Sequence, residues 1–377
     1  MLRRCFPWLL PSAALLASVA MSACGTSSGD DTSYTVPGED SGLPDQTTPD
    51  QSNPETTPPN DAPGVDVIVY PDSQPPPGKT IVYAHNDTKL YSVDPEAASP
   101  TLTEIGPFDC IGTSGDPSMT DIAVDKDGKL YGVSATNVYL DMKVQGSGVS
   151  CSAGMVAIDP GTVGPDAKFY GLSFAPPTAA LGTSETLIGS NSNGDLYVID
   201  KTNGKLTLVG NFGKVPNNDG QGHSYPSANV GKNWELSGDI VFLTNNGSPV
   251  GFATLRDCPN PPSSSNCGRV DTLVEIDVTK FAPSQAGGAP IVTKAVRGQV
   301  LPAGCSDETC GFGSMYGIAA FKDKVWGFSR KGDVLVINNS TGEGVSKGTP
   351  LVTPPSSNGF AGAGVTTLAP VTPPIPK

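Results

Sequence analysis

A short phrase recurs four times along the larger, C-terminal part of the chain. Each copy is an apolar run of strand-forming residues that ends at an Asp or Asn, and the copies occupy residues 89–95, 195–200, 272–277 and 333–338. Turn residues such as Thr202-Asn203-Gly204-Lys205 follow, and then another short strand. A second phrase precedes the first, at residues 121–124, 171–174, 239–242 and 317–320. Four short strands per unit, repeated along the chain, are typical of β-propeller blades.

The repeats predict an all-β propeller of about five four-stranded blades in residues 79–377. The first unit begins at residues 80–84, which match the second strand of a blade, and residues 364–368 match the missing innermost strand. We therefore expect the C-terminal strand to complete the first blade and to remove the open sheet edges. In the second unit, either residues 138–141 or residues 156–159 match the third strand. The number of blades is therefore defined only to within one.

These phrases resemble the repeats of quinoprotein-like and related bacterial propellers, over most of residues 79–370. The resemblance implies the fold. It says almost nothing about activity, because unrelated functions share this architecture.

The N-terminus is typical of an export signal. Met1-Leu2-Arg3-Arg4 gives a basic head, and residues 6–20 are apolar or small apart from Ser12 and Ser18. This run is shorter than the roughly 20 residues that a membrane span needs, and no later segment approaches that length. We expect no transmembrane helix in the mature protein.

The leader ends at Met21-Ser22-Ala23-Cys24, which resembles the lipobox of bacterial lipoproteins, with Met21 where Leu is usual. The resemblance implies a signal peptide at residues 1–23 and acyl chains, palmitate among them, on Cys24. Gly25 in place of Asp follows the sorting pattern for the outer membrane, with the periplasmic or surface side left open. Cleavage within residues 20–22, which would leave Cys24 as a free thiol, and twin-arginine export through Arg3-Arg4 are the alternatives.

Residues 24–78 are predicted to be a disordered, lipid-anchored linker. From residue 25 onward this segment contains ten acidic residues, no Lys or Arg, and eleven prolines. Such a composition cannot bury enough apolar surface to offset the entropy of ordering. At about 3.1 Å per residue the linker could reach on the order of 170 Å. The remaining domain is only mildly acidic, with scattered Lys and Arg, so nucleic-acid binding has no electrostatic support.

Six cysteines remain in the domain after the leader: Cys110, Cys151, Cys258, Cys267, Cys305 and Cys310. In an exported protein they indicate disulfides, for which 15 pairings are possible. Nearness in sequence favours Cys258 with Cys267 and Cys305 with Cys310, which leaves Cys110 for Cys151. Zinc is disfavoured, because the chain has two histidines and no C-x-x-C pair.

The long connections are expected on one face of the ring. Strand direction alternates within a blade, so the predicted insertions at residues 109–118, 214–233, 255–270 and 299–314 should all emerge together. We call this the long-loop face, and we expect tight turns such as residues 125–128 on the opposite face. Long loops on a rigid scaffold often carry function, although disulfides there could equally serve only to resist proteolysis. His223, Tyr225 and Trp234 are the candidate binding residues, suited to carbohydrate or protein contact, with Trp234 alternatively in the core.

Two carboxylates are expected near the axis. Asp121 and Asp239 occupy the column that Gly171, Gly317 and Gly364 fill in the other blades. They could bind a cation, calcium being the candidate, or act as an acid and base pair, or simply be solvated.

Three functions are consistent with the sequence. The first is a lipid-anchored binding or scaffolding module whose partner is a protein or a carbohydrate. The second is a hydrolase or lactonase-like propeller enzyme with a channel cation on Asp121 and Asp239. The third is a quinoprotein oxidoreductase, which only the repeated strand pattern supports. Binding is favoured over catalysis, because propeller enzymes usually need several channel carboxylates or histidines. No nucleophile elbow, P-loop, H-E-x-x-H or Rossmann motif occurs.

Overall fold

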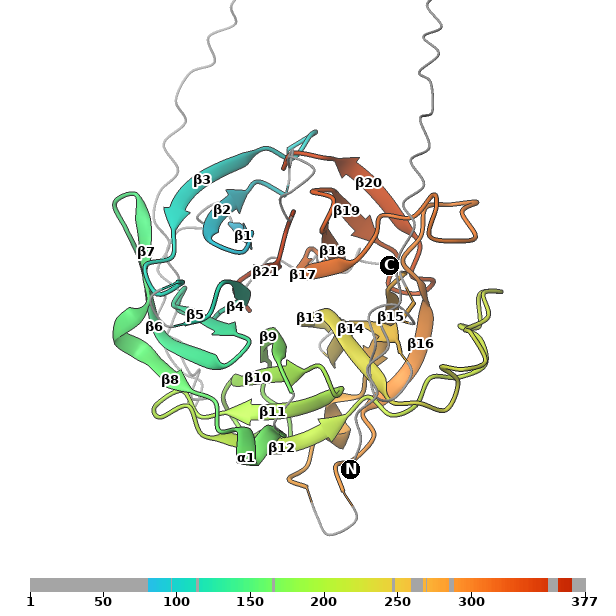
Figure 1. Ribbon diagram of the computed structural model, residues 1–377, viewed down its shortest axis with the longest axis horizontal. Helices are drawn as coiled ribbons and strands as arrows, with labels where there is room; N and C mark the ends of the chain where they lie inside the picture. Colours follow the sequence, from blue (N-terminus) through green and yellow to red (C-terminus); the bar gives the residue numbers. More distant parts are fainter. Residues whose placement is uncertain are drawn as a thin grey trace, which may run out of the picture. The chain divides into compact units, whose positions relative to one another are not determined.

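The domain is a five-bladed β-propeller, seen along its axis in a computed structural model (Figure 1). The structure describes residues 81–95, 97–112, 115–164, 167–245, 248–258, 267–268, 270–284, 288–351 and 359–367. All of them belong to one compact unit, which runs from Asp72 to Lys377. The predicted leader, Cys24 and the acidic linker lie outside the described residues.

Each blade is an antiparallel sheet, and its strands are named below in order from the axis outward. Blade 1 contains β21 (Gly362–Gly364), β1 (Val82–His85), β2 (Lys89–Val93) and β3 (Leu102–Pro107). Blade 2 contains β4 (Met119–Val124), β5 (Leu130–Ser134), β6 (Asn137–Gln145), and β7 (Gly148–Ser150) and β8 (Met155–Ala157), which both pair with β6. Blade 3 contains β9 (Phe169–Ala175), β10 (Thr186–Asn191), β11 (Asp195–Ile199) and β12 (Leu206–Asn211).

Blades 4 and 5 complete the ring. Blade 4 contains β13 (Trp234–Asn245), β14 (Ser248–Asp257), β15 (Thr272–Ile276) and β16 (Thr293–Gln299). Blade 5 contains β17 (Met315–Phe321), β18 (Lys324–Ser329), β19 (Val334–Ile337) and β20 (Gly344–Gly348). Short helical turns occur at η1 (Ser152–Gly154), α1 (Pro160–Val163) and η2 (Val278–Lys280). Among the described residues, none of the helices has the length and apolar character needed to cross a membrane.

The repeated phrases correspond to equivalent strands, as predicted. The first phrase forms the third strand of four blades, β2, β11, β15 and β19, and the second phrase forms the innermost strands β4, β9, β13 and β17. In blade 2 the third strand is β6, which contains residues 138–141. Residues 155–157 form the outer strand β8 instead. The prediction of five blades is confirmed.

The ring closes through β21, as expected, but two residues earlier than the sequence suggested. Ala363 pairs with Ala84 and Gly362 pairs with His85, so the innermost strand of blade 1 is Gly362–Gly364 rather than residues 364–368. The fully buried Phe360 fixes this register, because its ring packs edge-on against Phe328 in blade 5. The chain after β21 then crosses to blade 2, where Thr366 donates a hydrogen bond to the Asp125 carbonyl oxygen.

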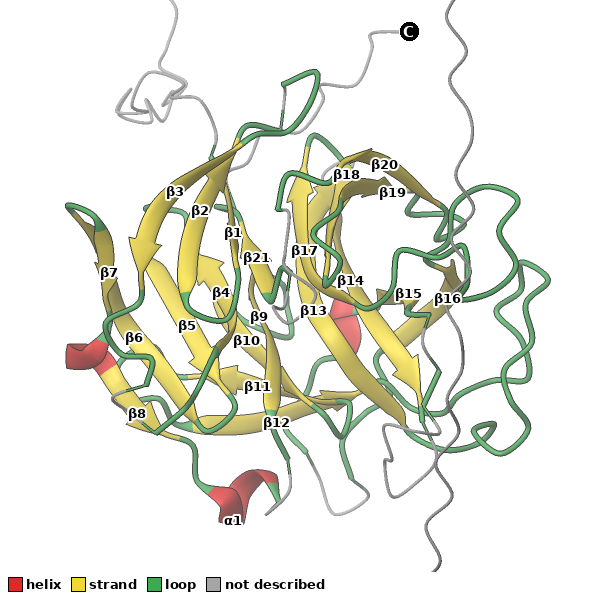
Figure 2. Ribbon diagram, turned by 45° about the horizontal axis from the view of Figure 1, so that its top comes forward, coloured by secondary structure: helices red, strands yellow, loops and turns green. Residues whose placement is uncertain are grey.

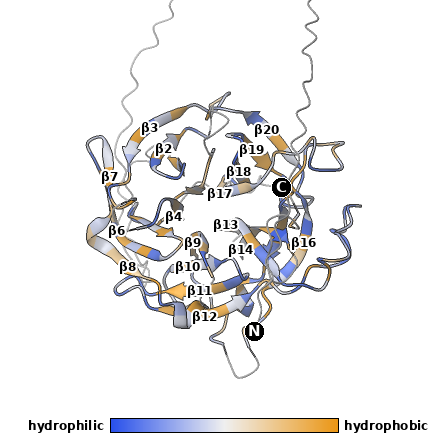
Figure 3. Ribbon diagram, in the orientation of Figure 1, coloured by the Kyte–Doolittle hydropathy of each residue, from blue (hydrophilic) through white to orange (hydrophobic). Residues whose placement is uncertain are grey.

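The core lies between the blades. Five apolar clusters each join two neighbouring blades, and the fifth joins blade 5 to blade 1. Hydrophobic residues occur in the strands of every blade (Figure 3), and strands such as β5 and β15 are buried along their whole length, because both faces of a blade pack against a neighbouring blade. Each blade therefore depends on both of its neighbours for burial of its apolar side chains.

The connections support a long-loop face, with one correction. The loops after β3, β12, β14 and β16 all leave the strands at the same end of the blades (Figure 2), as expected. The opposite face is not made of tight turns alone, however. It also holds the longer connections from β9 to β10 and from β15 to β16, which span residues 176–185 and 277–292. The difference between the two faces is thus smaller than the sequence suggested.

Removing residues 360–377 should destabilise the whole domain. The deletion takes away β21 and Phe360, and truncation of a buried Phe to Ala alone typically costs about 3–5 kcal/mol. We expect a large drop in the urea midpoint of unfolding and a tendency to aggregate, since the β1 edge becomes exposed. A control that lacks only residues 368–377 retains β21 and should unfold like the parent. Equal stability of both truncated proteins would contradict closure by β21.

Candidate binding site on the propeller axis

A ring of five backbone positions surrounds the axis, one from the innermost strand of each blade. Three are glycines, because a side chain on them would collide with the next strand: a Cβ on Gly317 would lie 2.7 Å from the carbonyl carbon of Gly362, and one on Gly362 would lie 3.0 Å from the Asp121 Cα. The members of this axial ring are Asp121, Gly171, Asp239, Gly317 and Gly362. The sequence analysis assigned Gly364 to this ring. Gly362 occupies the position instead, because the closing strand begins two residues earlier than expected.

The two aspartates of the axial ring are fully buried and link neighbouring blades. Asp121 Oδ2 accepts a hydrogen bond from the backbone N–H of Leu172 in blade 3. Asp239 accepts one from Ile240 N–H in its own strand and one from Ile318 N–H in blade 5. The two carboxyl groups lie close enough for the charge of Asp239 to act on Asp121. Both side chains lie in a closed layer and not at a wet channel mouth.

This carboxyl pair holds a proton. Burial raises the pKa of Asp121 well above its usual range, and the nearby Asp239 carboxylate raises it further. Burial also raises the pKa of Asp239, to about 8. Two carboxyl groups close together and away from water tend to keep a proton, because two adjacent negative charges repel each other strongly there.

His85 completes the buried layer from β1. Its Nδ1 donates to the Asn86 carbonyl oxygen at 2.9 Å, so Nε2 is the unprotonated nitrogen, and it lies 4.0 Å from Asp121 Oδ1. Burial lowers the pKa of His85 to about 4, so the ring is neutral. Nε2 and Asp121 Oδ1 have no hydrogen-bond partner among the described residues. A Cβ on Gly362 would lie 2.3 Å and 2.4 Å from these two atoms, so only glycine fits there.

The geometry of the pair does not suit a calcium ion. Calcium takes six to eight oxygen ligands, whereas three of the four carboxylate oxygens here accept backbone N–H groups. The fourth, Asp121 Oδ1, faces a histidine nitrogen. An acid and base role needs contact with a substrate, and both side chains have no exposed surface. The arrangement favours a structural layer over the cation site or acid–base pair considered from the sequence.

The buried layer separates two cavities on the axis. Toward the opposite face, a cavity of about 50 Å³ is lined by the residues that follow the axial ring, most of them apolar, such as Ile122, Leu172 and Ile240. Toward the long-loop face, a cavity of about 210 Å³ is lined by the residues that precede the ring. We call the second one the axial cavity. No residue of the axial ring lines either cavity, so the ring separates the two and forms the floor of the axial cavity.

All five blades contribute to the wall of the axial cavity, and most of the wall is polar. Its lining residues are Asp87, Ser118, Thr120, Tyr170, Ser237, Gly238, Tyr316, Arg330 and Ala361. Arg330 Nη1 lies 3.0 Å from Asp87 Oδ1, and its guanidinium carbon lies 4.7 Å from the centre of the Tyr316 ring. Convergent polar groups with aromatic walls are typical of small-ligand sites. The sequence analysis did not single out these residues; each of Thr120, Tyr170, Gly238, Tyr316 and Ala361 directly precedes a ring residue.

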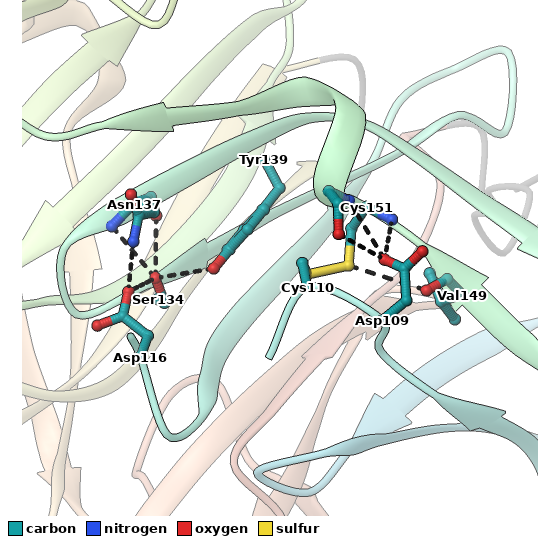
Figure 4. Close-up of a disulfide and its surroundings, with 9 residues drawn as sticks. Asp109, Cys110, Asp116, Ser134, Asn137, Tyr139, Val149 and Cys151 are labelled. Atoms are coloured by element: carbon teal, nitrogen blue, oxygen red, sulfur yellow. Dashed lines mark hydrogen bonds between the residues drawn. A yellow bond between two sulfur atoms is a disulfide. The ribbon is translucent and has the colours of Figure 1, made fainter. Parts of the chain in front are cut away.

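The loop that carries Ser118 is held at both ends (Figure 4). At one end, Cys110 is disulfide-bonded to Cys151, and the adjacent Asp109 accepts a hydrogen bond from Cys151 N–H at 2.8 Å. At the other end, Asp116 is buried and accepts hydrogen bonds from Asn137 Nδ2 and from the Ser134 hydroxyl. Ser118 follows two residues later, so its place at the cavity is fixed by blade 2.

All three disulfides have the connectivity expected from the sequence: Cys110–Cys151, Cys258–Cys267 and Cys305–Cys310. Each closes or anchors a loop of the long-loop face. The Cys110–Cys151 bond holds the loop that carries Ser118, a lining residue of the axial cavity. Such cross-links act mainly by limiting the unfolded chain.

The candidate residues of the 214–233 loop have different environments. Tyr225 and Trp234 are buried, with their rings edge to face at a centroid separation of 5.4 Å, and Tyr225 Oη lies 2.9 Å from Thr272 Oγ1. These two aromatic residues anchor the loop to the core and do not form a contact surface. Trp234 thus has the core position that was considered as its alternative, and Tyr225 differs from the expectation. His223 is partly exposed, and its Nδ1 lies 2.7 Å from Asp219 Oδ2.

His223 lines a second cavity on the long-loop face, of about 370 Å³. Asp257, Asp307 and Glu308 also line it, so it is acidic. Hydrogen bonds with Asn229 Nδ2 and the Gly268 N–H hold Asp257. Only the 214–233, 255–270 and 299–314 loops and their flanks contribute to this cavity, in contrast to the five blades around the axis.

Comparison with known proteins supplies little beyond the fold. No protein-family model and no curated protein matches the sequence. A protein of unknown function from Bacteroides thetaiotaomicron is 12% identical and has a TM-score of 0.35, over 71% of this chain and 57% of that one. Another from Bacteroides caccae is 8% identical (TM-score 0.31; 76% and 99% covered), and BamB from Moraxella catarrhalis is 12% identical (TM-score 0.26; 71% and 70% covered).

The chain thus spans little more than half the length of the Bacteroides thetaiotaomicron protein. No TM-score among these three reaches 0.5. The argument about function therefore rests on the residues of this chain.

The buried layer should make stability depend on pH. The raised pKa values mean that the folded protein keeps a proton which the unfolded chain releases above about pH 4. Its stabilising effect is complete below that pH and is lost as the pH rises toward about 8. His85 acts in the opposite direction, because its lowered pKa costs stability as the pH falls from 6.5 toward about 4. Between pH 6.5 and 8 the carboxyl pair dominates, and we expect the unfolding temperature to fall.

An Asp121→Asn variant should show a smaller fall in this pH range, since one buried carboxyl group is replaced by an amide that can still donate to Asp239. The matched control is Asp127→Asn, in the exposed turn after β4, which should retain the pH dependence of the parent. Calorimetry from pH 5 to 8 measures all three proteins. A parent whose unfolding temperature rises from pH 6.5 to 8 relative to the Asp121→Asn variant would show that the pair does not hold a proton.

Proposed function

We propose that this chain is a binding module that recognises its ligand on the long-loop face, with the axial cavity as the primary site. One observation carries the proposal: a polar cavity with walls from all five blades is closed beneath by the axial ring and has part of its wall on the loop that the Cys110–Cys151 disulfide holds. Sites of this kind are pre-formed, so binding requires little ordering of the protein.

Rigidity of the wall supports this function. Arg330 is held by Asp87 and by the Tyr316 ring, and Ser118 by the braced loop after β3. The innermost strands that carry Thr120, Tyr170 and Tyr316 are fixed by the inter-blade core. Side chains on such a scaffold keep their relative positions when a ligand enters.

We further propose that the module is held at a bacterial membrane. The lipobox-like leader supports acylation of Cys24, and Gly25 supports the outer membrane as the destination. Several acyl chains, each contributing about 0.8 kcal/mol per buried methylene, would make the anchoring stable. The acidic, proline-rich segment at residues 25–78 would act as a spacer that keeps the propeller clear of the membrane surface.

A substitution that fills the axial cavity should abolish binding to extracts of the native cell surface. Ser118 is partly exposed in the wall and makes no hydrogen bond within the described residues, so Ser118→Tyr adds volume at little cost to the fold. His223→Ala tests the acidic cavity, and Lys126→Ala tests the opposite face. We expect loss of more than 90% of the bound material with Ser118→Tyr alone, measured by pull-down with proteins of equal unfolding temperature.

Loss with His223→Ala alone would move the site to the acidic cavity. Equal loss from both faces, or no loss from any variant, would remove support for binding through the long-loop face.

Lipidation should depend on Cys24. A Cys24→Ala protein cannot receive the diacylglycerol, and we expect it to partition into the aqueous phase of a detergent separation, whereas the parent enters the detergent phase. Fractionation of the parent should recover it with the outer membrane. A Cys24→Ala protein that still enters the detergent phase would overturn the anchor, and recovery of the parent with the inner membrane would overturn the destination.

A further inference from the structure

The positive and negative side chains that line the axial cavity neutralise each other. Its lining contains one acidic and one basic side chain, Asp87 and Arg330, and these form an ion pair with each other. The Arg330 guanidinium also stacks on Tyr316 and lies 3.5 Å from the Phe360 carbonyl oxygen. An anionic ligand would have to compete with Asp87 for Arg330, and a cationic one with Arg330 for Asp87. A neutral ligand avoids this cost.

The next nearest charged groups behind the wall are Arg256, Asp271 and Glu235. Arg256 donates to the Ser237 hydroxyl at 2.8 Å, and its Nη2 lies 3.5 Å from Tyr316 Oη. Its Nε lies 3.9 Å from the buried Asp271 carboxylate. Arg256 therefore adds hydrogen-bonding polarity to the wall while its charge is offset by Asp271. Burial raises the pKa of the neighbouring Glu235, which lessens the negative charge that this residue adds.

Hydroxyl groups on the wall remain available to a ligand. Neither the Tyr170 hydroxyl nor the Ser118 hydroxyl makes a hydrogen bond within the described part of the chain, although both residues line the cavity. Thr120 donates to the Val133 carbonyl oxygen, which leaves its oxygen free to accept. Each hydroxyl can both donate and accept. A ligand that carries several hydroxyl groups can satisfy all of them.

The shape of the wall fits a ring-shaped ligand. Tyr170 and Tyr316 are both partly exposed and come from different blades, blade 3 and blade 5. Aromatic side chains offer apolar ring faces beside a polar tip, which suits a molecule with C–H groups on one face and hydroxyls at its edge. The cavity volume of about 210 Å³ corresponds to about seven waters at roughly 30 Å³ each, which is room for one sugar ring.

We propose that the axial cavity binds a neutral polyhydroxylated ligand of the size of one sugar ring, either a free monosaccharide or the terminal residue of a glycan. This proposal rests on the proposed function and names the chemistry of its ligand. Tyr170 and Ser118 are the residues that hydrogen-bond the ligand hydroxyls. The Asp87–Arg330 pair recognises two adjacent hydroxyls, one as acceptor and one as donor, without a change in net charge.

Saturation-transfer NMR on the full-length protein tests this, in a detergent without a sugar headgroup. The probes are neutral hexoses and N-acetylhexosamines, each compared with the uronate and the amino sugar of the same configuration, and a glycan array adds the terminal-residue arm. We expect a neutral sugar or a neutral glycan terminus to bind more tightly than its charged counterparts. Binding to the glycan array alone would identify the ligand as the terminal residue of a glycan. Binding of the free sugar alone would identify it as a monosaccharide.

Two variants place the ligand in the cavity. Tyr170→Phe and Ser118→Ala each remove a hydroxyl that has no protein partner, so both should fold like the parent. Loss of one ligand hydrogen bond worth about 0.5–1.5 kcal/mol corresponds to a Kd weakened about two- to tenfold. His223→Ala, in the acidic cavity, should leave the Kd unchanged.

The proposal is overturned if charged sugars bind at least as tightly as neutral ones, if no probe binds, or if the Kd is indifferent to Tyr170→Phe and Ser118→Ala. Pull-down from native extracts separates the two proposals. If Ser118→Tyr abolishes binding in the pull-down but no sugar binds, the chain is a binding module whose ligand is not a neutral sugar.

Discussion

The hydrogen bonds of the axial ring solve a problem that every propeller has at its centre. Innermost strands of neighbouring blades approach each other closely but belong to different sheets, so no ladder joins them. In this protein the carboxyl groups of Asp121 and Asp239 accept backbone N–H groups from the next blades, and the glycines of the ring leave space for them. Burial of two carboxyl groups is tolerable because they share a proton and receive several donors. The same layer closes the channel and gives the axial cavity its floor.

The floor and the wall of the cavity differ in how freely they can change. Asp121, Gly362 and His85 are constrained by contacts of a few ångströms on all sides, so replacing any one of them disturbs the ring. The side chains of Tyr170 and Ser118, one residue before Gly171 and three residues before Asp121, make no hydrogen bonds within the described residues. A propeller of this design can change its ligand by changing its wall while the ring that holds the blades together stays intact.

Local patterns in the sequence were sufficient for most of the fold. The strand phrases, the turns after them and two of the disulfides depend on residues close together in the chain, and the structure confirms them. The third disulfide, Cys110–Cys151, was the pair that remained. The closing strand was misplaced by two residues, because its register depends on Phe360 packing against Phe328 from another blade. Tyr225 was expected on a contact surface, because burial of its loop against a distant strand, here through Thr272, leaves no local signal in the sequence.

The candidate site was harder to predict for a related reason. A cavity on the axis is assembled from single residues contributed by five blades, and its charge balance comes from an ion pair between residues as far apart as Asp87 and Arg330. One signal was present nonetheless. Once the Asp/Gly column is recognised as the axial ring, the residue before each member must lie one layer closer to the long-loop face, because the innermost strands are parallel around the axis. Tyr170 and Tyr316 occupy that layer, and two tyrosines above a closed, neutral floor make recognition of an uncharged, hydroxyl-rich ligand the chemistry best matched to this propeller.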